Sequence, residues 1–536
     1  MNRHVRYLCA AVVATAMVCG CSGSGARQGA SMVLRIGNGA EPQDLDPQIT
    51  TGVPEHRIQS ALFEGLATLD PKTLEPTPAA AERWEVSADG LVYRFVIRAD
   101  AAWSNGEAVT AHDFAFSWQR ILSPNLASEY AYMLHCIKNA KAFNEGRIQD
   151  FAEVGVRVID DRTLEVTLEH PTPYLLSMQD HNAWYPVHRA TIERFGPIDK
   201  RATKWTRPGN LVGNGPFVLD RWDPDEAIRV VKNSAYWGAA DVRLDAIEFY
   251  PIQDLLTEER NFRSGQLDVT ESVPLSKIEV YQRDEPEVLH IDPYLGSYYY
   301  RFNVTRPPFD DVRVRRAFAM AIDRESLVRN VLKGGQRPAD CFTPPDTAGY
   351  TCSSAVPFDP GAARVLLAEA GYPEGRGLPT VELVYNTSEN HKLIAEAVQQ
   401  MWKVNLGVDV DLLNQDWKVY LDSMRNLDYG VARSGWIADY VDPNNFLECF
   451  LTGNGNNRTG YASEAYDALI AKANATIDPR ERLAVFQEAE KLLLEDCPFA
   501  PLYFYTRIYL KSTAVHGWQP NMLGFIPFKQ LRIATE

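Results

Sequence analysis

The chain has 536 residues, of which 45% are hydrophobic and 23% are charged. These proportions are ordinary for a globular protein, so they exclude extensive disorder and predict a large core in a chain long enough for roughly three average domains. The formal net charge of −16 at pH 7 opposes binding to nucleic acid and to anionic lipid surfaces.

The first twenty residues predict the compartment. Arg3 and Arg6 precede an apolar run over residues 8–19, and small residues follow, which is the order found in a secretory signal. The run is too short to span a bilayer. We therefore expect residues 1–20 to be a signal peptide and the rest of the protein to lie outside the cytoplasm.

The end of this signal, Val18-Cys19-Gly20-Cys21, resembles a bacterial lipobox. The resemblance implies that Cys21 is acylated, becomes the mature N-terminus and anchors the protein to a bacterial membrane. An ordinary cleaved signal with a chance cysteine is the alternative. The residues that follow are small and polar without apolar periodicity, so we expect residues 21–33 to be a flexible tether.

Five cysteines remain after the tether begins: Cys136, Cys341, Cys352, Cys449 and Cys497. Cys341 and Cys352 bracket a short loop rich in turn-forming residues, and an export compartment permits disulfides, so we predict that these two pair. The state of the other three stays open. No CxxC or HxxxH spacing occurs among them, and we expect no metal site and no cofactor.

Apolar periodicity in the first half predicts interleaved strands and helices. The expected elements are a strand at 34–36, a helix at 55–66, a strand at 91–98, a helix at 110–121, a hairpin at 156–159 and 164–168, and a strand at 247–250. Thr110 and Asp113 form the T-x-x-D pattern that begins a helix. A segment rich in Pro and Thr at 68–78 indicates entry into a second domain.

The second half alternates more regularly. The expected elements are strands at 298–304, 381–385, 408–412 and 502–505, and helices at 312–332, 361–370, 390–404, 464–473 and 480–495. Such alternation favours a mixed, partly parallel sheet. The motifs G-x-S-x-G, H-E-x-x-H and G-x-x-x-x-G-K-[ST] do not occur, so the sequence favours a protein that is not an enzyme.

Residues 88–114 resemble the signature of the peptide and nickel branch of extracytoplasmic solute-binding proteins, which serve ABC importers. The resemblance extends over residues 35–510 and sharpens to the oligopeptide-binding members through residues 45–47, 52–55, 292–295, 307–315 and 385–388. It implies an α/β, two-lobed periplasmic-binding-protein-like fold of type II, cluster C, with an extra third domain and a hinged ligand cleft. The implied segments are 34–67, 192–295 and 506–536 for lobe I, 68–191 for extra domain II, and 296–505 for lobe III.

The function implied by this resemblance is that of a monomeric receptor. Its partners are short peptides, which it encloses between the lobes, and the permease subunits of an ABC importer, to which it delivers them. A secreted peptide hydrolase is one alternative. The same receptor class with a cell-wall peptide, nickel chelate, haem or sugar is a second, and a surface adhesin or holdase is a third.

The resemblance also implies individual binding residues, chiefly in the segment 431–440 that lines the family's peptide cleft. Asp439 matches the carboxylate that receives the peptide α-ammonium, with a helix cap as its alternative role. Gly435 and Ile437 match positions whose backbone pairs with the peptide as a parallel strand, and Val53 matches the opposing antiparallel partner. Trp436 and Trp417 match pocket walls, and Tyr299 matches a lining residue. Arg433 and His391 match partners of peptide carbonyls and C-termini, and Asn386 lies in the matching segment 385–388. Trp417 as plain core and His391 as a surface imidazole are their alternatives.

This sequence departs from the family at three cleft positions. Thr51 stands where a Glu is usual, and Met424 and Leu332 stand where an Arg and a Lys are usual. Arg425 and Lys333 are next to the last two, but one residue along a helix turns a side chain by about 100°, so we do not expect them to substitute. The cleft is expected to hold less charge, and the preferred peptide length stays open.

Overall fold

The computed structural model describes residues 31–534, and the chain from Met32 onward forms one compact unit. The predicted signal peptide, the lipid attachment at Cys21 and most of the predicted tether lie outside the described residues. The tether prediction ends one residue too late, because strand β1 (Val33–Gly37) begins at Val33. In the described part, no helix is long and apolar enough to cross a bilayer.

The N-terminal lobe is built on a four-stranded sheet in the order β1-β10-β9-β8. Its further elements are α1 (Val53–Leu62), α5 (Arg189–Arg194), β8 (Phe217–Asp223), β9 (Ala227–Lys232), β10 (Ala246–Tyr250), β17 (Val515–His516) and β18 (Arg532–Ile533). Leu34, Ile247 and Phe528 share one core. The start, the middle and the C-terminal segment of the chain therefore pack together. Helix α7 (Leu275–Asp284), which the predicted segment 192–295 assigned to lobe I, packs in the core of the C-terminal lobe instead.

The extra domain is built on an antiparallel sheet in the order β4-β5-β7-β6. Its elements are β2 (Ala67–Leu69), β3 (Pro76–Pro78), β4 (Ala81–Val86), β5 (Val92–Ile97), α2 (Ala111–Ile121), α3 (Ala140–Asn144), β6 (Val156–Asp160), β7 (Thr163–Thr167) and α4 (Leu175–Met178). Thr110 and Asp113 form the predicted capping box of α2. Phe95, Trp118 and Leu164 lie in a separate core that belongs to this domain.

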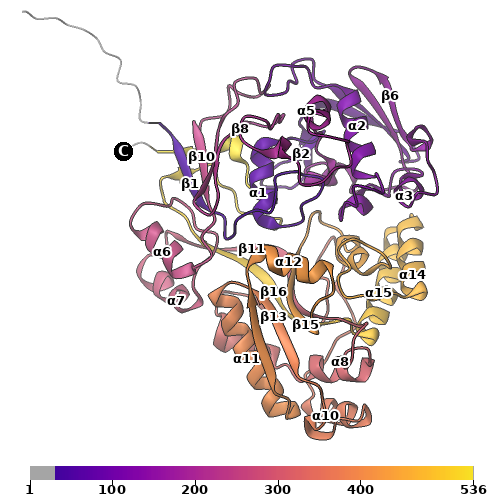
Figure 1. Ribbon diagram of the computed structural model, residues 1–536, viewed down its shortest axis with the longest axis vertical. Coiled ribbons are helices and arrows are strands. Elements are labelled where there is room, and N and C mark those ends of the chain that lie inside the picture. The colour runs from indigo at the N-terminus through magenta and orange to yellow at the C-terminus, as the bar shows by residue number, and fades with distance from the viewer. Residues whose placement is uncertain (1–30, 535–536) are drawn as a thin grey trace, which may run out of the picture. The chain divides into compact units, whose positions relative to one another are not determined.

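The C-terminal lobe is built on a six-stranded mixed sheet in the order β12-β16-β11-β15-β13-β14. Its strands are β11 (Leu289–Phe302), β12 (Arg337–Pro338), β13 (Val381–Asn386), β14 (Val410–Gln415), β15 (Val431–Ile437) and β16 (Phe499–Leu510). Its helices are α8 (Val312–Met320), α10 (Pro360–Glu369), α11 (Glu389–Leu406), α12 (Trp417–Arg425), α13 (Asn444–Leu447), α14 (Glu464–Ala475) and α15 (Pro479–Asp496). Helices α6 (Leu255–Arg263) and α7 (Leu275–Asp284) lie beside this lobe (Figure 1). Strand β13 is parallel to both β14 and β15, which confirms the predicted mixed sheet.

Helix α1 ends four residues before its predicted end. The carbonyl oxygen of Leu62 accepts a hydrogen bond from the main-chain N–H of Gly215 at 2.9 Å, and Phe63 is already extended. A Cβ on Gly215 would lie 2.5 Å from the Leu62 carbonyl carbon, so only glycine permits this approach. A contact between segments distant in sequence therefore ends the helix.

The predicted single helix at 312–332 is wrong. It is broken into α8, the short α9 (Arg324–Ser326) and a π-helical turn, η5 (Leu327–Leu332). Asp323 accepts a hydrogen bond from the main-chain N–H of Ser326 at 2.9 Å and so caps the second piece. Aspartate competes with the helical backbone in this way, which favours a helix start over a helix interior.

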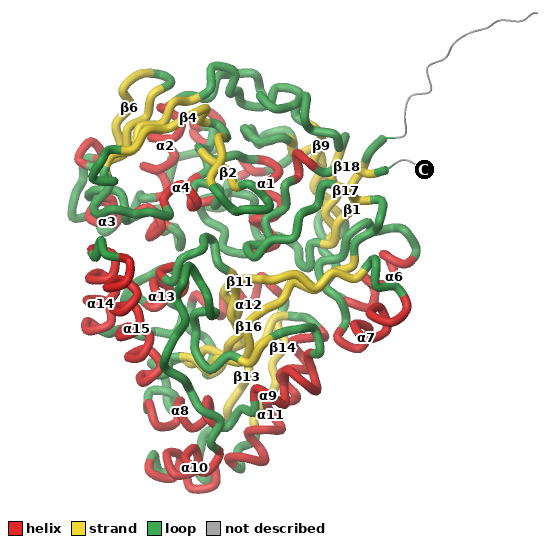
Figure 2. The backbone as a smooth tube through the Cα atoms, turned by 180° about the vertical axis from the view of Figure 1, so that it is seen from behind, coloured by secondary structure: helices red, strands yellow, loops and turns green. Residues whose placement is uncertain are grey.

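Two long strands, β11 and β16, join the N-terminal and C-terminal lobes (Figure 1). They run antiparallel from Leu289 paired with Leu510 to Arg301 paired with Phe499. Figure 2 shows them side by side from behind. Their pairing is interrupted between Pro293 and Ser297. A two-stranded ribbon with a gap in its ladder bends more easily than a packed core, so the predicted hinge fits this segment.

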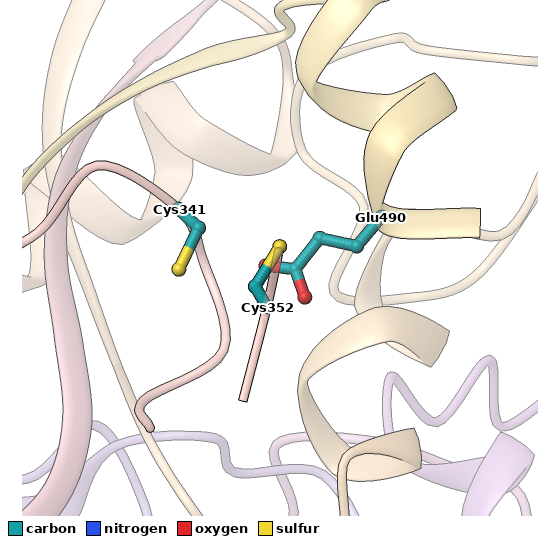
Figure 3. Close-up of side chains that lie close together, drawn as sticks. All are labelled: Cys341, Cys352 and Glu490. Atoms are coloured by element: carbon teal, nitrogen blue, oxygen red, sulfur yellow. The ribbon is translucent and has the colours of Figure 1, made fainter. Parts of the chain in front are cut away.

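Cys341 and Cys352 are free thiols in the structure, so the predicted disulfide is not formed there. Their sulfur atoms and a carboxylate oxygen of Glu490 lie within 4.8 Å of one another (Figure 3). The thiols donate instead to the carbonyl oxygens of Thr343 and Ser354, at 3.5 and 3.4 Å. The two sulfurs are therefore neighbours although no bond joins them.

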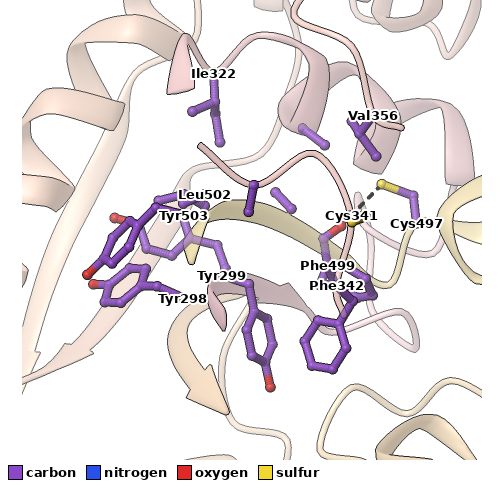
Figure 4. Close-up of a cluster of buried hydrophobic side chains, with 14 of the residues drawn as sticks. Tyr298, Tyr299, Ile322, Cys341, Phe342, Val356, Cys497, Phe499, Leu502 and Tyr503 are labelled. Atoms are coloured by element: carbon purple, nitrogen blue, oxygen red, sulfur yellow. Dashed lines mark hydrogen bonds between the residues drawn. The ribbon is translucent and has the colours of Figure 1, made fainter. Parts of the chain in front are cut away.

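Glu490 explains why the loop that carries both cysteines is held in place. Its carboxylate accepts hydrogen bonds from the main-chain N–H groups of Phe342 and Thr343, each at 2.8 Å, and from the hydroxyl of Tyr350 at 2.7 Å. Figure 4 shows Cys341 and Phe342 within the core of this lobe. The loop is therefore fixed by buried hydrogen bonds before any covalent link forms.

We expect oxidation of the purified protein with oxidised glutathione to join Cys341 and Cys352. Proteolysis and mass spectrometry should find the two segments linked, with a mass lower by two hydrogens, and the link should add at most about 3 kcal/mol to the free energy of unfolding because the closed loop is short. Cys136→Ser is the matched control and should change neither result. Recovery of both cysteines unlinked after oxidation would contradict the prediction.

Candidate ligand cleft

A cavity of about 460 Å³ lies between the lobes, a size ordinary for a small-molecule or peptide site. The N-terminal lobe, the extra domain and the C-terminal lobe all contribute to its wall. Nine of the ten predicted site residues line it: Val53, Asn386, His391, Trp417, Arg433, Gly435, Trp436, Ile437 and Asp439. Residues far apart in the sequence are thus brought into one site.

Tyr299 is the exception, and its predicted place in the lining is wrong. Its side chain is buried behind the wall, where its ring meets those of Phe342 and Phe499 edge to face at centroid distances of 5.1 and 5.7 Å (Figure 4). Its hydroxyl accepts a hydrogen bond from Arg301 Nη2 at 3.3 Å. Arg301, two residues further along the same strand, lines the cavity instead.

Asp439 follows β15 and points its carboxylate into the cavity wall. Its side chain is only 12% exposed, and its Oδ1 lies 3.4 Å from Nε2 of His181. Asn445 donates to Oδ2 at 3.4 Å, and its side-chain oxygen accepts from the Asp439 main-chain N–H at 3.0 Å. The amide of Asn445 therefore orients the carboxylate. No helix begins at Asp439, so the alternative role as a cap is not supported.

The electrostatic state of this carboxylate is unusual. Burial raises the pKa of Asp439 to about 7, with the hydrogen bond from Asn445 acting in the opposite direction. Burial, with a smaller contribution from His56, holds the pKa of His181 well below its ordinary value of 6.5. His181 is therefore neutral at pH 7, and no lysine or arginine in the described part of the chain pairs with Asp439. When Asp439 is ionised, its negative charge has no cationic partner in the described protein, and a positively charged ligand group can supply one.

Strand β15 presents a free edge to the cavity. One side pairs with β11 up to Ile437, whereas the other side pairs with β13 only at Val431 and Ala432. Within the described strands, the backbone beyond Ala432 therefore has no strand partner on that side. A Cβ on Gly435 would lie 2.4 Å from the hydroxyl oxygen of Tyr505, so no side chain fits there. The edge is suited to an extended ligand backbone.

Aromatic side chains form the side walls. Trp417 stacks on Tyr420 at a centroid distance of 5.7 Å, and its indole N–H donates to Glu55 at 3.4 Å. The indole N–H of Trp436 donates to Asn445 at 3.1 Å. Both rings have satisfied polar groups and apolar faces, so they offer contact without demanding a particular ligand side chain.

Arg433 supplies positive charge on a second part of the wall. It donates to Asn386 at 3.1 Å and to the hydroxyl of Tyr505 at 2.8 Å, and it lies over the ring of Tyr298 at 4.8 Å. Burial and the charge of Arg433 keep the pKa of His391 well below its ordinary value. His391 is thus a neutral, partly exposed group of the cavity wall, within hydrogen-bond distance of the Tyr298 hydroxyl at 3.3 Å, and not a surface imidazole.

Arg425 and Lys333 do not take the cleft positions that Met424 and Leu332 occupy, as the sequence predicted. Arg425 forms ion pairs with Glu129 and Asp422, and Lys333 forms an ion pair with Glu279 at the surface. Neither residue lines the cavity. Sequence analysis did not identify several charged and polar residues of the lining, among them Arg57, Arg301, Arg458 and Arg507, with Tyr130 and His181 from the extra domain. An arginine inside the apolar strand 298–302 was a signal for Arg301.

Known proteins show which family has this arrangement. The model of the family described as bacterial extracellular solute-binding proteins, family 5 middle, matches residues 75–458. The periplasmic oligopeptide-binding protein OppA of Escherichia coli is 40% identical over 490 residues, which cover 90% of this chain and 88% of that protein. The structure of Haemophilus influenzae OppA in complex with RPPGFSPFR has a TM-score of 0.90 and 34% identity, covering 94% of this chain and 99% of that chain.

Two structures of the murein tripeptide binding protein MppA give information on conformation. The Escherichia coli MppA structure has a TM-score of 0.90, whereas the unliganded open form of MppA has 0.63, and each is 36% identical and covers 94% of this chain. The lobes of this chain are therefore arranged unlike those of the open form. With its family signature, its two-lobed fold and its interlobe cleft, the chain belongs to the family 5 bacterial extracellular solute-binding proteins.

Proposed function

We propose that the protein is a receptor outside the cytoplasm that binds short peptides in the cleft and passes them, chemically unchanged, to the permease subunits of an ABC importer. Asp439 carries the proposal, because it is a buried carboxylate that no described lysine or arginine neutralises. The α-ammonium of a peptide supplies the missing charge. A charge-assisted hydrogen bond of this kind is worth about 1.5–3 kcal/mol.

The free edge of β15 supports a peptide over other ligand classes. An extended peptide that adds to a strand edge forms main-chain hydrogen bonds that do not depend on its side chains. Arg433, with no carboxylate partner among the described residues, is placed to receive the C-terminal carboxylate or a peptide carbonyl. A nickel chelate or a haem has no ammonium to pair with Asp439.

The proposal extends to the location of the receptor. The lipobox resemblance supports acylation of Cys21, which would hold the protein as a monomer at a bacterial membrane, with the segment before β1 as its tether. Relatives that bear the name periplasmic protein support a position outside the cytoplasm.

Glu129 supports closure of the cleft over the ligand. It lies in the extra domain and pairs with Arg425 and Arg458, both from the C-terminal lobe. Burial alone would raise the pKa of Glu129, but the two guanidinium groups hold it below its usual value. The Glu129 side chain is only 11% exposed. Because its two arginine partners belong to another lobe, these ion pairs form only when the lobes meet. Closure thus couples ligand capture to a buried ionic contact.

We expect Asp439→Asn to weaken the binding of a short peptide such as trialanine by at least about tenfold, because the ammonium loses its charged partner. Isothermal titration calorimetry after removal of co-purified ligand measures the affinity. The melting temperature of the ligand-free variant should stay the same or rise, since a buried unpaired charge is removed.

The control for this experiment is Asp428→Asn, which changes an exposed carboxylate that pairs with Arg306. Equal affinities of wild type and Asp439→Asn would contradict the assignment of the ammonium site. Mass spectrometry of the recovered peptide tests the rest of the proposal, because cleavage products would indicate a hydrolase.

Peptide affinity should rise with pH from about pH 5.5 to about pH 7.5. The pKa of Asp439 is about 7 in the empty cleft, so the carboxylate is protonated and neutral at the lower pH and cannot pair with an ammonium. Peptide binding favours the ionised form and therefore releases a proton. Calorimetry in buffers of different ionisation enthalpy should detect this release in the wild type and not in Asp439→Asn. Above about pH 8 the peptide α-amino group loses its own charge, and the gain should reverse.

Glu129→Gln should lower peptide affinity although Glu129 does not line the cavity. Loss of one member of a buried charge cluster costs about 3–5 kcal/mol and acts here on the closed form. Stopped-flow measurements should show faster peptide dissociation, with little change in association. Glu279→Gln, in an exposed pair with Lys333, is the control. Unchanged dissociation in Glu129→Gln would contradict a role in closure.

A further inference from the structure

Arg301 is a buried cation in the cleft wall that the binding of a plain peptide leaves unneutralised. It lies on β11, is 7% exposed and lines the cavity. Its Nη2 donates to the hydroxyls of Tyr299 and Ser434, while its Nε and Nη1 have no hydrogen-bond partner. Two hydroxyl acceptors solvate the guanidinium in part but do not balance its charge.

The groups around Arg301 are neutral. Tyr299, Tyr420 and Tyr429 surround it, and burial raises the pKa of Tyr299 and of Tyr429, so their phenols stay protonated at pH 7. No carboxylate among residues 31–534 lies within 4.0 Å of the Arg301 guanidinium nitrogens. A buried guanidinium without a counter-ion is costly, which predicts that its counter-ion arrives from outside the chain.

The other arginines of the cavity differ from Arg301. Arg57 pairs with Glu271, and Arg458 pairs with Glu129. Arg433, the next residue to Ser434, projects from the opposite face of β15 toward Asn386 and Tyr505. The fifth, Arg507, is only partly buried and donates to the carbonyl oxygen of Gly524. In the proposed peptide complex Asp439 takes the ammonium and Arg433 takes the C-terminal end, so Arg301 is the fully buried arginine of the wall that keeps an uncompensated charge.

The charge of the cavity is also opposite to that of the whole chain. Five arginines and three carboxylates line it, whereas the formal net charge of the chain is −16. One of those carboxylates, Asp180, has its pKa raised to about 7 by burial, which reduces the negative charge further. An acidic protein with a cationic cleft selects anionic ligands by the local field of the cleft.

We propose that Arg301 and Ser434 form a subsite for a carboxylate side chain, so that the receptor prefers peptides containing Glu or Asp. This inference rests on the proposed peptide-binding function. The carboxylate accepts charge-assisted hydrogen bonds from the guanidinium, which is planar and always charged. The ligand then carries three charges, each with a partner in the cleft: the ammonium at Asp439, the terminal carboxylate at Arg433 and the side-chain carboxylate at Arg301.

The test compares tripeptides of alanine in which one residue is replaced by Glu or by its uncharged isostere Gln, at each of the three positions. Calorimetry at about pH 7.5 on stripped wild-type protein should show at least about tenfold tighter binding of Glu over Gln at one position. Arg301→Gln should abolish that preference while still binding the Gln peptides. Lys333→Gln, which removes an exposed cation outside the cavity, should keep the preference.

The comparison within the wild type needs no variant, so a poorly folded Arg301→Gln does not prevent the test. Equal affinity for Glu and Gln at all three positions overturns the inference and leaves the proposed function intact, because the Gln peptides still bind. A preference that survives in Arg301→Gln also overturns it and assigns the carboxylate to another residue. Failure of every peptide to bind overturns the proposed function itself.

Discussion

The binding site depends on the unequal pairing of buried charges. The Asp439 side chain is only 12% exposed, yet its neighbours are an amide and a neutral imidazole. In water such a carboxylate would be solvated, and in an ordinary core it would be paired with a cation. Here the chain bears the cost of leaving it without a cation. In the proposed function, the ligand ammonium is that cation, and specificity for the end of a peptide follows from it.

The fold maintains this imbalance because the cleft is shared by separate cores. The walls come from three lobes, each with a core of its own, so in the proposed closure each wall moves as a unit about β11 and β16. In the proposed closed state, Glu129 adds an ionic contact between the extra domain and the C-terminal lobe. Removal of water at closure strengthens every charged contact inside. The same movement therefore captures the ligand and increases its affinity.

The cleft divides recognition between backbone and charge. The free edge of β15 and the aromatic walls accept many side chains, which gives breadth. In the proposed complex, Asp439 and Arg433 hold the ends of the ligand and Arg301 favours an acidic residue between them. Met424 and Leu332 stand where the family resemblance implied cations, while Arg301 places a positive charge elsewhere in the cleft wall.

Sequence alone determined the local features of this protein. The capping box of α2, the β6–β7 hairpin and the long amphipathic helices depend on neighbouring residues, and the segment around Asp439 was recognised by its order of residues. Tertiary structure decided the rest: Gly215 ends α1, Arg301 and not Tyr299 lines the cleft, and Glu129 joins two arginines about 300 positions away. Such contacts depend on burial and on partners distant in the chain, and a one-dimensional pattern of residues records neither.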